Sequence, residues 1–172
     1  NGSNGTNGTN GENGITPTFK VEGIELFVSY DNGETWSAPV ILSSQVKNDN
    51  EEFLGIGPGQ GYVTQYNGKE RIIFCVYDNT YLYERVSTIY SDDNGVTWHR
   101  GTPTTHRIGV AKTSEAQIVA LPDGTLRMFA RNGFSYVAYA DSTDGGVSWS
   151  QFKQDLNLAS NGNCMVSFIN VD

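Results

Sequence analysis

The chain has 172 residues, of which 37% are hydrophobic and 12% aromatic, which is enough for one modest globular core. Its formal net charge of −8 provides no basic surface for a phosphate backbone, so the composition argues against a nucleic-acid-binding protein. No apolar run approaches the roughly 20 residues that cross a bilayer as a helix, so we expect no membrane span.

The first 14 residues, NGSNGTNGTNGENG, contain no apolar side chain. A segment of this composition cannot bury apolar surface, so we predict a flexible tail or linker over 1–14 and one domain over 15–172. Asn1, Asn4 and Asn7 each begin an Asn-Gly-Ser/Thr sequon, which would accept a glycan only on a eukaryotic secretory route. Tandem Asn-Gly repetition explains these sequons equally well.

From residue 15 onward, short apolar runs alternate with Asn-Gly, Asp-Gly or Gly-Gly turns. The runs are rich in Val, Ile, Tyr and Phe and often alternate with period two, which predicts strands joined by hairpins. No segment has the period of an amphipathic helix, so we expect an all-β fold. The predicted strands lie in IELFVSY (24–30), GYVTQY (61–66), ERIIFCVY (70–77), RVSTIYS (85–91), AQIVALPDG (116–124), TLRMFARN (125–132), SYVAYADS (135–142) and CMVSFINV (164–171).

One nine-residue unit occurs three times, as SYDNGETWS at 29–37, SDDNGVTWH at 91–99 and STDGGVSWS at 142–150. Each copy falls between two strand signals, so we interpret it as a hairpin connection whose glycine adopts a turn conformation that a side chain would strain. The aspartate can accept hydrogen bonds from the turn, and the tryptophan can bury its ring beneath the hairpin. The three predicted structural turns contain Asp31, Gly33 and Trp36, then Asp93, Gly95 and Trp98, then Asp144, Gly146 and Trp149.

Metal binding has little support in this sequence, and we expect neither a metal nor a cofactor. An EF-hand loop needs an acidic or amide residue five positions before its glycine, but Val28 stands there for Gly33 and Tyr90 for Gly95. The run NDNEE at 48–52 predicts a solvated loop, for which weak calcium binding stays open. Cys75 and Cys164 lie in apolar runs without zinc spacing and are expected to act as small hydrophobes, and His99 and His106 as surface residues.

A repeat of about 50 residues with four strand signals is typical of propeller blades, and the three units resemble the Asp-boxes of the sialidase (neuraminidase) family. FLGIGPGQG at 53–61 resembles the Phe-Leu-Gly-x-Gly-Pro-Gly-x-Gly segment of that family. TSEAQIVALPDGTLRMFARN at 113–132 resembles the stretch that carries two of its catalytic-site residues. The resemblance covers 19–172 and implies part of a six-bladed β-propeller, with about two full blades, parts of two more, and truncation at both ends.

In sialidases a tyrosine attacks the anomeric carbon after an acidic residue activates it, an aspartate is the acid/base, and three arginines bind the sugar carboxylate. By motif, Glu115 matches the activating glutamate and Arg131 one of the arginines, and Tyr77 resembles a tyrosine on the glycerol side of the sugar pocket. From the residues alone, a simpler interpretation stays open: Glu115 lies at an exposed strand start, Arg131 in a surface turn, and Tyr77 is an aromatic residue at a strand end. The nucleophile, the acid/base and the other arginines have no match in this sequence.

The resemblance therefore implies a fragment of a secreted or cell-surface exo-sialidase that removes terminal sialic acid from glycoconjugates with retention of configuration. The fragment alone would be inactive. Its partners would be sialylated glycans and the remaining blades of the propeller. Two alternatives stay open: a non-catalytic Asp-box propeller that binds glycan or protein, and a trans-sialidase in which an acceptor sugar replaces water.

Overall fold

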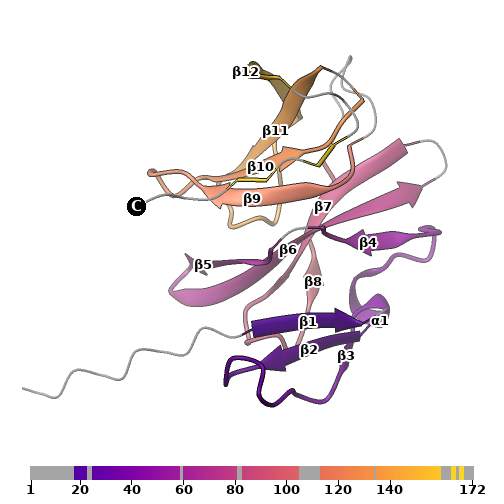
Figure 1. Cartoon of the computed structure of the whole chain (residues 1–172), viewed down its shortest axis with the longest axis vertical. Coiled ribbons are helices and arrows are strands. Elements are labelled where there is room, and N and C mark those ends of the chain that lie inside the picture. The colour runs from indigo at the N-terminus through magenta and orange to yellow at the C-terminus, as the bar shows by residue number, and fades with distance from the viewer. Residues whose placement is uncertain are drawn as a thin grey trace, which may run out of the picture.

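A computed structural model of the chain describes residues 18–22, 25–58, 60–80, 83–104, 113–133, 135–159, 164–165 and 167–168. These residues form antiparallel sheets, and Figure 1 shows a first sheet at the bottom, a middle sheet and a last sheet at the top. The all-β prediction is confirmed, although one short helix, α1 (Ser43–Val46), is present that the sequence does not predict. The predicted tail over 1–14, with its three sequons, and His106 lie outside the described residues.

Each sheet is built from neighbours in sequence. The first has the order β1-β2-β3, the middle β4-β6-β7-β8 with β5 also paired to β6, and the last β12-β11-β10-β9. The strands are β1 (Thr18–Glu22), β2 (Glu25–Ser29), β3 (Val40–Ile41), β4 (Leu54–Ile56), β5 (Tyr62–Tyr66), β6 (Lys69–Thr80), β7 (Tyr83–Ser91), β8 (His99–Arg100), β9 (Ala116–Ala120), β10 (Leu126–Ala130), β11 (Tyr136–Ser142) and β12 (Lys153–Ala159).

Most predicted strands are confirmed, and the exceptions have a physical explanation. No strand is predicted for β12, because its sequence KQDLNLA is mostly polar and belongs to a sheet edge, where Leu156 is 69% exposed. In the strand predicted over CMVSFINV, the described residues 164–165 and 167–168 have no strand structure. Cys164 there is exposed, so it does not pack as the small hydrophobe that the sequence predicts, whereas Cys75 lies buried in the core.

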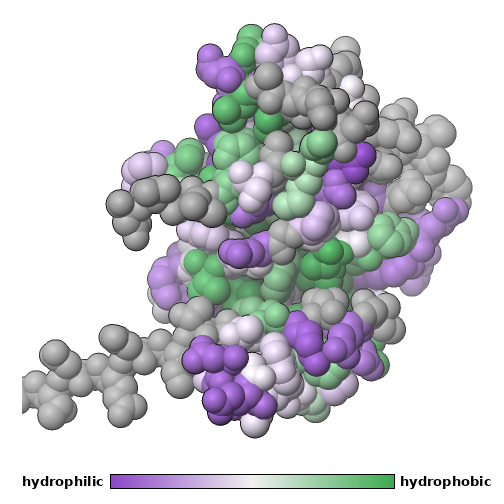
Figure 2. Space-filling view, viewed as in Figure 1, coloured by the Kyte–Doolittle hydropathy of each residue, from purple (hydrophilic) through white to green (hydrophobic). Residues whose placement is uncertain are grey.

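Apolar side chains fill the two spaces between the sheets. Figure 2 shows apolar residues gathered where the first and middle sheets meet. The core residues there are Leu26, Leu42, Val46, Ile72, Val76, Ile89 and Trp98. Those between the middle and last sheets include Ile73, Cys75, Val86, Ile118, Leu126, Met128, Ala138 and Phe152. Burial of these side chains is the main force that holds the sheets together.

The three repeated units have the turn geometry that their sequence predicts. Their glycines have φ angles of +89°, +86° and +85° in chain order. In each unit the serine hydroxyl donates to the aspartate at 2.6, 2.8 and 2.8 Å and accepts the glycine amide at 2.8, 2.8 and 2.9 Å. Trp98 is fully buried, whereas Trp36 and Trp149 are half-buried, so the predicted burial of the ring holds fully only for the second unit.

The second and third units also join neighbouring sheets. Arg71 of β6 donates to the carbonyl oxygen of Gly145 at 3.1 Å, and Thr88 of β7 donates to that of Gly146. One sheet earlier, the Tyr30 hydroxyl donates to the carbonyl oxygen of Asn94 at 3.1 Å. The turns of two sheets are therefore bound to the sheets before them, which aligns their strand ends.

Candidate functional site

The repeated turns and the predicted site residues lie at opposite ends of the sheets. In the last sheet, Leu126 at the start of β10 pairs with Ser142, where the third turn begins. Glu115 precedes β9 and Arg131 follows β10, so both lie at the far end of these strands. We call this end of the sheets the open rim.

Glu115 and Arg131 form an ion pair on this rim. The Arg131 amide donates to the Glu115 carbonyl oxygen at 2.9 Å, so their backbones are neighbours across the two strands. Nη1 of Arg131 donates to Oε2 of Glu115 at 2.8 Å, and the two side chains are 34% and 23% exposed. The carboxylate is therefore paired with a cation yet still reached by solvent, so it avoids the cost of an isolated buried charge.

The chain immediately after Arg131 is held in place by Asn132. The side chain of Asn132 is almost fully buried, and its amide donates to the carbonyl oxygen of Tyr136 at 2.8 Å. This bond closes the connection between β10 and β11. The sequence alone gives no signal for this bond, because an Asn-Gly pair reads equally well as an exposed turn.

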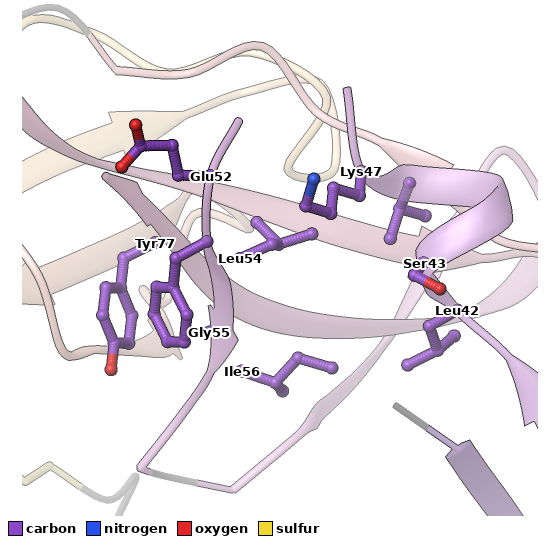
Figure 3. A pocket seen from close by; sticks show the side chains of 10 residues that line it. Leu42, Ser43, Lys47, Glu52, Leu54, Gly55, Ile56 and Tyr77 are labelled. Carbon is purple, nitrogen blue, oxygen red and sulfur yellow. The ribbon is translucent and has the colours of Figure 1, made fainter. Parts of the chain in front are cut away.

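Tyr77 lies near the open rim in a separate hollow. It pairs in register with Gly55 of β4, and its ring centroid is 5.6 Å from that of Phe53. Both rings border a pocket of about 570 Å³ between α1 and β4, which we call the Tyr77 pocket. Figure 3 shows Tyr77, Leu54 and Ile56 around this pocket, with Lys47 and Glu52 nearby. Glu115 and Arg131 are not among the residues that line it.

A buried cluster of charges lies behind the Tyr77 pocket, and the sequence does not predict it. Nη2 of Arg100 donates to Oε1 of Glu51 at 3.2 Å and to Oδ2 of Asp78 at 3.3 Å. Arg85 donates to Oδ1 of Asp78 at 3.1 and 3.2 Å. Burial lowers the pKa of the Arg100 guanidinium below its ordinary value, while Glu51 and Asp78 act in the opposite direction.

Glu51 corrects one expectation from the sequence. The run at 48–52 predicts a solvated loop, but the Glu51 side chain is fully buried. Its carboxylate accepts the amide of Asn48 at 2.9 Å and the Asn48 side chain at 3.0 Å. The prediction is wrong for Glu51, because a run of polar and charged residues does not reveal that one of them pairs with the buried Arg100 of a distant strand.

The described residues contain no group of three or more His, Cys, Asp or Glu side chains that could hold a metal ion. The thiol of Cys75 is an unreactive core group, because burial raises its pKa. His99 is exposed beside the ring of Tyr90. No helix in the described part of the chain is long and apolar enough to cross a membrane.

Comparison with known proteins agrees with this architecture. The family model of the BNR repeat-like domain matches residues 10–170, and the chain belongs to this family. The chain is 35% identical to a sialidase of Paraclostridium sordellii over 158 residues, which cover 86% of this chain and 38% of the relative. It is 34% identical to an anhydrosialidase of Macrobdella decora over 133 residues, which cover 77% of this chain and 17% of the relative.

Solved structures give the same result. The intramolecular trans-sialidase of Ruminococcus gnavus superposes with a TM-score of 0.65 at 36% identity, over 78% of this chain and 27% of that protein. A Hadza microbial sialidase superposes with a TM-score of 0.66 at 28% identity, over 82% and 26%. The antiparallel sheets and these neighbours indicate a propeller-type fold. The chain spans less than half the length of each of these relatives.

Proposed function

We propose that residues 15–172 form the central blades of a six-bladed sialidase propeller, which removes terminal sialic acid from glycoconjugates. In this proposal the three sheets are one incomplete blade and two complete ones, and further blades supply the nucleophilic tyrosine, the acid/base aspartate and the other arginines. The protein would be secreted or displayed at the cell surface, where sialylated glycans occur. The similarity to sialidases over most of the chain supports this assignment.

The observation that carries the proposal is the Glu115–Arg131 pair at the end of the last sheet opposite to the repeated turn. Glu115 would accept the phenolic proton of the tyrosine as its oxygen attacks the anomeric carbon. A phenol suits this step, because a carboxylate nucleophile would be repelled by the carboxylate of the sugar. Arg131 would bind that carboxylate, since its planar fork forms two parallel hydrogen bonds. Tyr77 would line the glycerol side of the sugar.

The test is a pair of substitutions in the full-length protein, assayed with a fluorogenic sialoside. Glu115→Gln keeps the shape but removes the base, so we expect kcat to fall by about 10²- to 10⁴-fold. Arg131→Lys replaces a two-pronged contact by a single charge, so we expect KM to rise and kcat to fall.

The matched control is Arg127→Lys. Arg127 lies in β10, the strand that Arg131 follows, and forms a bidentate pair with Asp141 at 2.7 and 3.0 Å, with similar exposure, but at the end of β10 near the repeated turn. We expect its kinetics to stay close to wild type. Equal losses in Arg127→Lys and Arg131→Lys would contradict the assignment of Arg131.

A trans-sialidase is the second candidate, because the similar proteins include an anhydrosialidase and an intramolecular trans-sialidase. In that case a hydroxyl of the sugar or of an acceptor replaces water in the second step. Mass spectrometry of the products separates these cases: hydrolysis yields free sialic acid, intramolecular transfer yields a product lighter by one water, and transfer to an acceptor yields the sialylated acceptor.

A further inference from the structure

The buried charge cluster of Glu51, Asp78, Arg85 and Arg100 extends across four parts of the middle sheet. Glu51 precedes β4, Asp78 lies in β6, Arg85 in β7 and Arg100 in β8. Asp78 pairs with Leu54 of β4 on one side and with Arg85 on the other. A single set of ion pairs therefore joins β6, β7 and the outer strand β8 to the segment that leads into β4.

The same cluster is adjacent to the wall of the pocket. Asp78 directly follows Tyr77, and Glu51 lies just before Phe53. Gly55 allows the two rings to rest against β4, because a Cβ atom there would lie 2.8 Å from Cε1 of Phe53 and 2.8 Å from Cε1 of Tyr77. Figure 3 shows Tyr77 beside the β4 residues Leu54 and Ile56, with Leu42 and Ser43 across the pocket. Any shift of β4 against β6 would therefore move these rings.

Arg100 depends on the two carboxylates. Its side chain is 10% exposed and those of Glu51 and Asp78 are fully buried. Within the described part of the chain, Nε and Nη1 of Arg100 are buried without a hydrogen-bond partner, so Nη2 makes its polar contacts. Removing one carboxylate would leave a buried charge poorly compensated, and the strands would move to solvate it.

We propose that Glu51, Asp78 and Arg100 are positioning residues that fix the ring of Tyr77, which would line the glycerol side of the sugar, by tying the connection before β4 to β6 and β8. This inference rests on the proposed function. The three residues act through Tyr77 and do not touch the sugar, so their loss should weaken binding and leave the chemical step intact.

The experiment compares Glu51→Gln and Arg100→Lys with wild type in the full-length protein. With a fluorogenic sialoside, we expect KM to rise about tenfold while kcat changes less than about twofold. Glu51→Gln is the milder variant, because it keeps the size of the side chain and, through its single acceptor oxygen, one of the two hydrogen bonds from Asn48. Near-ultraviolet circular dichroism confirms that each variant is folded at the assay temperature.

The matched control is Arg71→Lys at the other end of the same sheet. Arg71 is also buried, forms a bidentate pair with Asp92 at 2.6 and 2.7 Å, and stacks on the ring of Tyr90 at 4.1 Å. We expect this variant to lose thermal stability and to keep the wild-type KM.

Two results would overturn the inference. One is an unchanged KM in folded Glu51→Gln and Arg100→Lys, and the other is an equal rise of KM in Arg71→Lys, which would show a general effect of destabilisation. A wild-type protein that cleaves no sialoside would instead contradict the proposed function, and the inference would fall with it.

Discussion

Each aspartate of the repeated turns is held as an anion by its neighbours. Asp31 accepts hydrogen bonds from the Ser29 hydroxyl at 2.6 Å, from the Thr35 amide at 2.9 Å and from the Thr35 hydroxyl. The Ser29 and then the Thr35 bonds lower the pKa of Asp31 from its ordinary value of 3.8 to about 2. Burial alone would raise the pKa values of Asp93 and Asp144, but the equivalent hydrogen bonds, from Thr97 and Ser91 and from Ser148 and Ser142, lower them.

These shifts predict how stability depends on pH. A carboxyl group with a depressed pKa in the folded state stabilises it above the unfolded pKa of about 3.9, and this contribution is lost as pH falls through the folded value. We expect the Tm to fall between pH 4 and pH 2. Asp31→Asn should have a lower Tm at pH 7 and a shallower fall, and Thr35→Ala, which removes one donor and so raises the folded pKa of Asp31, should show a smaller fall that ends at a higher pH. Identical profiles in calorimetry for all three proteins would contradict this account.

The Glu115–Arg131 pair shows what the sequence can and cannot predict for single residues. The sequence motif identifies the two residues as candidates. The β9–β10 hairpin then places them side by side, because residues that flank paired strands are neighbours. Glu51, Asp78 and Arg100 have no such signal, because their contacts join β6 and β8 with the connection before β4. Long-range pairs of this kind follow from the order of the strands in the sheet and not from any local sequence pattern.

Strands and helices are likewise predicted only where a local sequence pattern indicates them. Strands rich in Val, Ile and Tyr, such as β7 and β11, are predicted, because apolar side chains on both of their faces enter hydrophobic clusters. The edge strand β12 and the helix α1 are not, since neither has an apolar stripe of its own. The structure of β12 depends on its pairing with β11, and that of α1 on the burial of Val46. Tertiary contacts therefore decide both elements.

One difference among the repeated turns has a structural cause. The third turn has Gly145 where the others have Asn32 and Asn94. All three have positive φ angles, which asparagine tolerates, so backbone strain alone does not demand glycine. A Cβ atom on Gly145 would lie 2.6 Å from Cδ2 of Tyr66, which stacks on Arg71 at 4.3 Å. Glycine is therefore needed because the third turn packs against this aromatic ring.

We accordingly expect Gly145→Asn to destabilise the protein by about 1–3 kcal/mol, which is typical of overpacking. The free energy of unfolding can be measured with urea. Asn94→Gly is the control and should change stability by less than about 1 kcal/mol, because it adds no atoms. In a Tyr66→Leu background, Gly145→Asn should cost less than in the wild type. An equal loss in both backgrounds would show that Tyr66 is not the reason for glycine.

At the scale of the whole molecule, the repeated turns join neighbouring sheets, whereas the open rim holds the candidate site residues. The second and third turns bind the preceding sheet at one end, so the strand ends at the other end are held in register without contributing to that contact. The candidate site residues then come from two sheets, with Tyr77 in the middle sheet and Glu115 and Arg131 in the last. A catalytic centre assembled in this way needs every sheet that contributes a group.

This division leads to the last prediction. By resemblance, the 172 residues offer neither the nucleophilic tyrosine nor the acid/base aspartate, and only one of three arginines. Since positioned nucleophile and acid/base groups supply most of the rate, we expect the 172-residue polypeptide to hydrolyse a fluorogenic sialoside no faster than buffer. A longer chain that includes the flanking blades should be active, and its Glu115→Gln variant is the control for contaminating activity. Robust turnover by the 172 residues alone would show that the site is complete within the three sheets, with a nucleophile other than the expected tyrosine.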